Sequence, residues 1–357
     1  MKFGLKRSNM RVLQIGRSGY LDGYFERDVV RFDTSSFGGR SSKAPNGLRE
    51  LYSAVFGERF DLIVCEPNYL APYDLRALSR VIFSRRMLAE GASITRPFGK
   101  QLLRGSRLPF VVLDTEDNAS INRCDHYLLK RCMLYFKREL PVDEWKLFSH
   151  TLSSGLPSRR FRGNSQLKGL LGKMRPISLG IAPEMEALLP SIEPNPKTVD
   201  VFFAGAVEGL PERERGIAEL RRLSGSGVVI DIPDRRLERM EFYRRCAQAH
   251  LVWSPEGYGW DCFRHHEAAA CGSVPMINYP SIRPYKPMED GVHCFYYSSE
   301  VGALSKTIRQ ALGDKSRLAT MSAAARDHAL THHRRASIGR HIIDAALHSL
   351  SHAPAGR

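Results

Sequence analysis

The sequence of 357 residues contains no apolar run of about 18 residues or more, which is the length that crosses a bilayer. Its first seven residues include three charged side chains and no apolar segment of the kind that secretory signals carry, so we expect no such signal. We therefore expect a cytoplasmic protein. Peripheral binding at the inner face of a membrane stays open as an alternative.

Two well-known nucleotide-binding patterns are also missing. There is no Gly-x-Gly-x-x-Gly followed by an acidic residue, and no Gly-x-x-x-x-Gly-Lys-Ser/Thr. These absences argue against a nicotinamide dehydrogenase and against a P-loop nucleotidase. The seven cysteines contain no Cys-x-x-Cys pair, which disfavours a disulfide framework and a zinc site.

Acidic residues are too few to balance the basic ones. The chain has 53 Lys and Arg against 38 Asp and Glu, for a formal charge of +15. Such an excess indicates an anionic partner, and a nucleoside diphosphate, an acidic lipid headgroup and a nucleic acid all qualify. The hydrophobic fraction of 43% is sufficient for packed cores, and the length predicts about two domains.

Short apolar runs alternate with helical patterns in both halves of the chain. In the first half we predict strands at 10–16, 60–65 and 108–113, a helix at 75–90, and either a strand or a helix within 125–140. In the second half we predict strands at 199–205, 228–231, 250–253, 274–278 and 294–297, with helices at 213–222, 237–249, 300–312, 315–333 and 335–350.

This alternation predicts an α/β protein of two Rossmann-like domains that face an interdomain cleft. We expect an N-terminal, acceptor-side domain at 1–190 and a C-terminal nucleotide-sugar domain at 198–334. Residues 335–357 would form a helix that crosses back to the first domain, followed by a short tail.

Residues 254–277 form the most informative segment. A strand end leads through a glycine-bearing turn into a short helix, and a new strand follows. Arg264 near the start of that helix suits a diphosphate, because helix N-termini favour anions. Glu256 in the turn and Glu267 in the helix are placed to accept hydrogen bonds from sugar or ribose hydroxyls. We expect Asp261 to cap the helix, and we expect no shared metal at His265 and His266, which face different directions.

Other glycines and arginines also follow predicted strands. Gly205 follows the strand at 199–205, where a missing side chain lets a phosphate approach the backbone. Arg213 and Arg215 come shortly after it, and either could neutralise a phosphate. Gly16 and Gly19, after the first strand, form a glycine loop that we expect at the cleft.

Three acidic residues follow the strand at 108–113. A sugar transfer with inversion needs a group that takes the proton of the acceptor hydroxyl, and we name Asp114, Glu116 and Asp117 as candidates for that base. Glu66, after the strand at 60–65, is a weaker second choice.

The segment 254–277 resembles the C-terminal signature of GT-B glycosyltransferases, in particular the exostosin-like and CgeB-like group. The matching residues are Arg264-x-x-Glu267-Ala268, then Gly272-x-x-Pro275-Met276, and residues 135–140 are similar to a segment of such enzymes. The resemblance implies that Arg264 binds the donor diphosphate, Glu267 binds ribose or sugar hydroxyls, and Gly205 lies beside the phosphates. We assign the turn residues to the same donor side; they are Glu256, Gly257, Tyr258 and Gly259.

The resemblance implies a glycosyltransferase that needs no metal and no cofactor other than its nucleotide-sugar donor. Retaining enzymes of this fold show two Glu separated by seven residues, whereas ten separate Glu256 from Glu267, which favours inversion. We expect a glycan or lipid-linked glycan as acceptor. Two alternatives stay open: transfer to nucleic acid, and a non-catalytic protein that binds polyanions. For the nucleic-acid alternative, a basic segment would hold phosphates; its members are Arg159, Arg160, Arg162, Lys168, Lys173 and Arg175.

Overall fold

The computed structural model describes residues 10–16, 18–22, 29–32, 48–57, 59–67, 103, 105–121, 125–148, 165–192 and 196–352. The helix predicted at 75–90 and the basic residues Arg159, Arg160 and Arg162 lie outside this part of the chain. Contacts divide the chain into two units. Unit 1 comprises Met1–Pro176 and Gly339–Arg357, and unit 2 comprises Ile177–Ile338.

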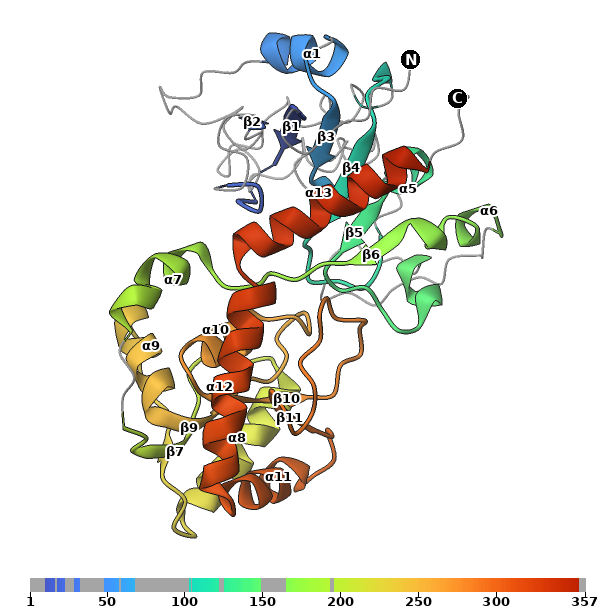
Figure 1. The fold of residues 1–357 in the computed structure, drawn as a ribbon. Helices are drawn as coiled ribbons and strands as arrows, with labels where there is room; N and C mark the ends of the chain where they lie inside the picture. Colours follow the sequence, from blue (N-terminus) through green and yellow to red (C-terminus); the bar gives the residue numbers. More distant parts are fainter. Residues whose placement is uncertain are drawn as a thin grey trace, which may run out of the picture. The chain divides into compact units, whose positions relative to one another are not determined.

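Unit 1 is built on a parallel sheet of six strands in the order β2-β1-β3-β4-β5-β6 (Figure 1). The strands predicted in the first half are confirmed, and residues 125–140 form both a helix and a strand. The described strands are β1 (Val12–Ile15), β2 (Val29–Phe32), β3 (Leu62–Cys65), β4 (Phe110–Asp114), β5 (Tyr135–Lys137) and β6 (Met174–Pro176). Its described helices before the C-terminal one are α1 (Leu48–Phe56), α5 (His126–Arg131), η5 (Glu144–Phe148), α6 (Ser165–Lys168) and η6 (Leu171–Lys173).

Unit 2 has a second parallel sheet, of five strands in the order β11-β10-β9-β7-β8. Every element predicted in the second half is present. The strands are β7 (Val199–Phe202), β8 (Ile230–Asp231), β9 (Ala249–Trp253), β10 (Val274–Asn278) and β11 (Phe295–Tyr297). The helices are α7 (Pro183–Leu188), η7 (Leu189–Ser191), α8 (Pro211–Ser224), α9 (Arg239–Gln248), α10 (Phe263–Ala270), α11 (Ala303–Leu312) and α12 (Lys315–His332).

The second sheet is buried on both faces, as parallel sheets require. Successive residues of a strand point to opposite faces. In β9, Leu251 and Trp253 therefore belong to one core cluster, and Val252 between them belongs to the other. The expected α/β class with two Rossmann-like sheets is confirmed.

Helix α13 (Arg335–Ser351) passes from one unit to the other, since the division falls within its first turns, between Ile338 and Gly339. Gly339 is the first residue of α13 that belongs to unit 1, and it packs against the beginning of that unit: an added Cβ would lie 2.1 Å from the carbonyl oxygen of Tyr20. The prediction that the last helix returns to the first half of the chain is confirmed.

The division between the units falls after Pro176, ahead of the expected boundary at residue 190. The cause is hydrophobic burial. Residues of α7 and its flanks, among them Ile181, Met185 and Ile192, pack in the same core cluster as Phe202 of β7.

Among the described helices, none is long and apolar enough to cross a membrane.

Gly216 in α8 tests the packing of the core cluster that contains Trp253. An added Cβ would lie 2.1 Å from Cζ2 of Trp253, which is fully buried. We expect Gly216→Ala to lower the free energy of unfolding by about 1–3 kcal/mol, because overpacking forces neighbours off their positions. Urea denaturation measures this change.

Gly225 provides the control, since it ends the same helix with φ of −67° and an added Cβ would make only an ordinary contact. Gly225→Ala should leave the stability unchanged or raise it slightly. Equal destabilisation by the two substitutions would contradict the packing argument.

Candidate functional site

The strand order of unit 2 indicates where a ligand would bind along the edge of its sheet. After β7 the chain adds β8 on one side of it and then β9 on the other. In open α/β sheets, ligands bind at the carboxyl ends of the strands where the order reverses in this way. The loops that follow β7 and β9 therefore flank the expected site.

Gly205 and Arg264 meet at this position. An added Cβ on Gly205 would lie 2.3 Å from Nη2 of Arg264, so a side chain at this position would displace the guanidinium. The Arg264 side chain also lies over the ring of Phe203, with Cζ 5.0 Å from the ring centre. Sequence analysis placed both residues on the donor side, and the structure brings them into contact.

The guanidinium of Arg264 has hydrogen-bond donors that no described residue uses. Its Nε and Nη1 are inaccessible to solvent and have no hydrogen-bond partner among the described residues. Burial, together with the charge of Arg213, lowers the pKa of Arg264 to about 10. A buried cation with unused donors is destabilising until an acceptor arrives, so an anion that accepts from this group would be bound favourably.

The helix that carries Arg264 adds to this effect. Arg264 is the second residue of α10, whose N-cap, Cys262, makes no side-chain hydrogen bond to the helix. The first N–H groups of a helix favour an anion, and here they begin beside a cationic side chain.

Arg213 fixes the two loops that flank the position. Its Nε donates to the carbonyl oxygen of Glu256 at 2.9 Å, and its Nη1 donates to that of Ala206 at 2.8 Å. Nη2 lies 3.5 Å from the carbonyl oxygen of Pro255. Arg213 is buried, and burial lowers its pKa. Its donors are thus committed to joining the loop after β7 to the loop after β9.

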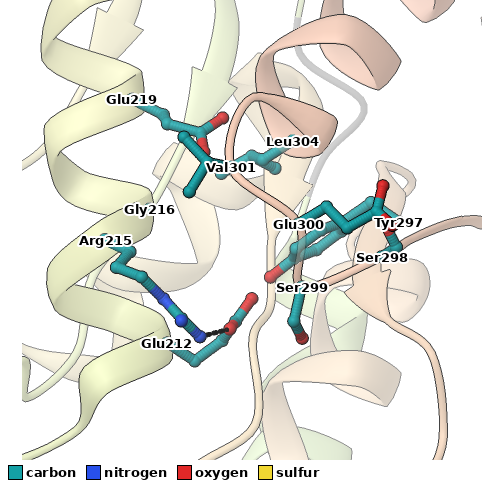
Figure 2. A pocket seen from close by; sticks show the side chains of 10 residues that line it. All are labelled: Glu212, Arg215, Gly216, Glu219, Tyr297, Ser298, Ser299, Glu300, Val301 and Leu304. Carbon is teal, nitrogen blue, oxygen red and sulfur yellow. Dashed lines mark hydrogen bonds and ion pairs between the residues drawn. The ribbon is translucent and has the colours of Figure 1, made fainter.

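Arg215 lies elsewhere. Figure 2 shows its side chain pointing from α8 toward Glu212, with which it forms an ion pair of 2.8 Å. The two residues line a cavity of about 10 Å³ beside the 297–301 segment, which has room for one water at most. The carboxylate of Glu219 in the same group accepts from the backbone N–H of Gly302 and of Ser305, and so caps α11.

The turn at 256–259 is fastened to the end of β10. The N–H of Glu256 donates to Oδ1 of Asn278 at 2.8 Å, and Nδ2 of Asn278 donates back to Oε2 of Glu256 at 3.1 Å. The N–H of Gly257 donates to the carbonyl oxygen of Gly259 at 2.9 Å, which puts Tyr258 at the tip of the turn. Burial raises the pKa of Glu256.

A cavity of about 980 Å³ opens in unit 2 beside Gly205. Glu267 lines it and accepts from the hydroxyl of Tyr243 at 3.2 Å, and burial raises the pKa of this carboxyl. Residues from five segments form the walls, namely 182–184, 204–206, 233–237, α9 and α10, together with Arg335. This volume is ample for a ligand of nucleotide size.

Sequence analysis missed the wall formed by 233–237. The segment carries Arg235 and Arg236 and follows directly on the predicted strand at 228–231. Its position at a strand end was the available signal. Arg235 is paired with Glu241 at 2.8 Å, and Arg239 is paired with Glu184 at 2.9 Å, so both cations already have partners.

The expectation that Asp261 caps α10 is wrong. The N-cap is Cys262, and Asp261 instead accepts from the N–H of Leu179 at 2.7 Å and from the hydroxyl of Ser178 at 3.0 Å. His266 Nε2 completes the group at 3.0 Å from the Ser178 oxygen. Buried backbone N–H groups need acceptors, and Asp261 supplies one to the incoming chain.

His265 serves the local structure. Its Nε2 lies 2.8 Å from the carbonyl oxygen of Trp260, and its Nδ1 lies 2.7 Å from the hydroxyl of Ser254. Burial lowers its pKa to about 3, so the ring is neutral at neutral pH. Within the described ranges, no group of three or more His, Cys, Asp or Glu side chains is arranged to hold a metal ion.

At the carboxyl edge of the first sheet, Gly16 packs against Glu66. Gly16 has φ of +148°, and an added Cβ would lie 2.3 Å from the carboxyl carbon of Glu66. That carboxylate accepts from the N–H of Ser18 at 2.7 Å. An added Cβ on the neighbouring Gly19 would lie 2.8 Å from Oδ2 of Asp22. The glycine loop is thus held by the residue that we rated a weaker candidate base.

The three candidate bases of unit 1 differ in their surroundings. Asp114 is buried and accepts from the hydroxyl of Tyr135 at 2.9 Å, from Nζ of Lys137 at 3.0 Å and from the N–H of Glu116 at 3.2 Å. Asp117 is half exposed and paired with Arg138. Burial, with the charges of Asp114 and Asp117, raises the pKa of Glu116.

The comparisons with known proteins found similar solved structures. HepE of Anabaena with UDP and glucose is 14% identical, with a TM-score of 0.44, covering 94% of this chain and 99% of its own. A glycosyltransferase of Rickettsia africae is 10% identical, with a TM-score of 0.47, covering 97% and 100%. An alpha-glucosyltransferase with UDP and a 13-mer DNA is 8% identical, with a TM-score of 0.49, covering 95% and 99%. No family model matches the chain, and no curated protein matches its sequence.

Arg213 and Arg215, which both belong to α8, give a test of these roles. We expect Arg213→Ala to lower the free energy of unfolding by about 1–3 kcal/mol, because it leaves the carbonyl groups of the two loops without donors. Arg215→Ala, two residues away and 56% exposed, should change it by about 0.5 kcal/mol at most. Urea denaturation of both variants measures the difference. A loss of equal size in the two variants would show that Arg213 does not fix the loops.

Proposed function

We propose that this chain is a glycosyltransferase that moves a sugar from a nucleoside-diphosphate donor to a hydroxyl group, with the donor bound in unit 2. The observation that carries the proposal is Arg264. Two nitrogens of its guanidinium are inaccessible to solvent and have unused donors, and the group lies against Gly205 at the start of a helix, where the order of the parallel strands reverses. These features together suit a diphosphate.

The adjoining cavity supports the nucleoside part of the proposal. It has room for a base and a ribose, and its lining includes the apolar side chains Leu237, Phe242 and Phe263. Glu267 has a carboxylate at the cavity wall that accepts hydrogen bonds, as ribose hydroxyls require. We assign the ribose to Glu267 and the diphosphate to Arg264 and Gly205.

The proposed sugar transfer is a displacement at the anomeric carbon of the donor. The oxygen of the acceptor hydroxyl attacks the anomeric carbon of the donor, and the bond from that carbon to the diphosphate breaks. The leaving diphosphate takes the electron pair, and Arg264 with the N-terminus of α10 stabilises its charge, which is the role that a metal plays elsewhere. We propose inversion and independence from metal ions on these grounds and on the spacing of Glu256 and Glu267.

The proton of the acceptor hydroxyl goes to a base, for which we propose Glu116 of unit 1. Asp114 is committed to three donors, and Asp117 is paired with Arg138. Glu116 has a raised pKa, which brings a carboxylate closer to the range in which a base works well at neutral pH. We propose a glycan or lipid-linked glycan as acceptor, reached at an anionic membrane surface through the excess positive charge.

A first test concerns the diphosphate. Arg264→Met should weaken the binding of uridine, guanosine, cytidine or thymidine diphosphate, whichever binds, by about 10- to 100-fold, because charge-assisted hydrogen bonds contribute about 1.5–3 kcal/mol. Isothermal titration calorimetry measures the affinity. Arg222→Ala, an exposed arginine on α8, is the control and should keep it. Undiminished affinity in Arg264→Met would remove this residue from the site.

A second test concerns the base. Glu116→Gln should lower turnover by about 100-fold or more, with a smaller effect on nucleotide affinity, and Asp117→Asn should cost less. A base works only when deprotonated. Because the pKa of Glu116 is raised, turnover of the natural chain should fall as the pH drops through that raised value, and the fall should start at a higher pH than an ordinary carboxyl gives. Full activity of Glu116→Gln would place the base elsewhere.

A further inference from the structure

Two tyrosines of unit 2 are largely exposed at the edge that carries the proposed donor site. Tyr258 is 72% exposed and Tyr279 is 58% exposed. Tyr258 follows β9 and Tyr279 follows β10, and these two strands are neighbours in the sheet. An exposed aromatic ring leaves apolar area in contact with water, so two of them at a ligand-binding edge call for an explanation.

The two residues belong to neighbouring loops that are joined by hydrogen bonds. Glu256 and Asn278 form a reciprocal pair, and Nε1 of Trp260 donates to the carbonyl oxygen of Asn278 at 2.9 Å. Tyr258 lies two residues from Glu256 in its turn, and Tyr279 is adjacent to Asn278. Their backbones are therefore fixed with respect to each other.

The ring of Tyr279 also has a built support. Its N–H donates to the carbonyl oxygen of Tyr297 at 3.0 Å, and its ring stacks on that of Tyr296 with 5.6 Å between centres and 26° between planes. Tyr296 in turn lies beside Trp260, with 6.4 Å between ring centres. One face of the Tyr279 ring is thus covered by protein while much of the side chain stays exposed.

Glu256, which lies in the same turn as Tyr258, supplies a carboxylate at this edge of the sheet. Oε2 of Glu256 accepts from Asn278, whereas Oε1 has no hydrogen-bond partner within the described part of the chain. Exposed aromatic faces together with a free carboxylate oxygen match the two sides of a pyranose, whose C–H groups pack on rings and whose hydroxyls donate to acceptors. A phosphate backbone would meet the negative charge of Glu256 unfavourably, which favours a neutral sugar over a nucleic acid.

We propose that Tyr258 and Tyr279 form a platform that binds a neutral sugar ring of the acceptor glycan. This inference rests on the proposed function and adds to it an acceptor subsite in unit 2. It also gives new roles to Tyr258 and Glu256, which we expected on the donor side from the sequence. The aromatic rings supply the contact, and Glu256 supplies a hydrogen-bond acceptor for one hydroxyl.

The test uses the full chain, fluorescently labelled, on a printed array of neutral and acidic oligosaccharides. The natural chain should retain neutral glycans. Tyr258→Ala and Tyr279→Ala should each weaken that binding by about tenfold, which is the scale of an aromatic contact, and the matching Phe variants should keep it. Tyr52→Ala is the control, because Tyr52 is 56% exposed and lies on α1 of unit 1.

Three results would overturn the platform. They are the absence of any retained neutral glycan, binding that survives loss of either ring, and an equal loss in Tyr52→Ala. Binding of a single-stranded oligothymidylate that depends on the same two rings, without glycan binding, would also overturn it and would favour a nucleic-acid acceptor.

Titration with the four nucleoside diphosphates separates this inference from the proposed function. If a diphosphate binds to the natural chain and to Tyr279→Ala alike while no glycan is retained, the platform alone fails. If no diphosphate binds to the natural chain, the proposed function fails, whatever the array shows.

Discussion

The contact between Arg264 and Gly205 is the constraint on which the proposed donor site depends. The guanidinium occupies the space that a side chain at residue 205 would fill, and two of its nitrogens are cut off from both solvent and acceptors. Removing a cation from water without a partner is costly, and Arg213 nearby adds repulsion. Only a fold with enough stabilisation elsewhere can hold such a group, and a bound diphosphate would supply the missing acceptors.

The surroundings explain how the group stays in place. Arg213 joins the loops after β7 and β9 through three backbone carbonyls, and the pairing of Glu256 with Asn278 extends the same restraint to the end of β10. Polar groups that are fixed before a reaction stabilise developing charge without reorganising. In this arrangement the guanidinium of Arg213 holds the loops in place through its hydrogen bonds, whereas the unused donors of Arg264 remain for the proposed ligand.

The fold could be predicted from the sequence to a large extent, and the site only in part. Alternating apolar runs located the strands of the second half, because a parallel sheet buried on both faces demands continuous apolar segments. β2 and β6 were missed, since one has exposed positions and the other is three residues long with a proline. Local patterns placed Gly205 and Arg264 at one edge. They could not distinguish Arg213 from Arg215, because that difference arises from how α8 packs against loops distant in the sequence.

The net charge of +15 says little about the chemistry, because individual cations are neutralised by neighbouring carboxylates. Near the cavity, Arg235 and Arg239 are neutralised by Glu241 and Glu184. Arg264 differs from these two, because its Nε and Nη1 have no acceptor among the described residues. On the proposed acceptor side, Glu256 lies in the turn that carries Tyr258, and its partner Asn278 is adjacent to Tyr279. The proposed function thus combines, on one sheet edge, a cation for the diphosphate and a carboxylate that accepts from the hydroxyls of a neutral glycan. The reciprocal pairing with Asn278 fixes the Glu256 carboxylate at the end of β10, whereas Arg264 lies at the start of α10, so the two proposed ligands are assigned to different elements.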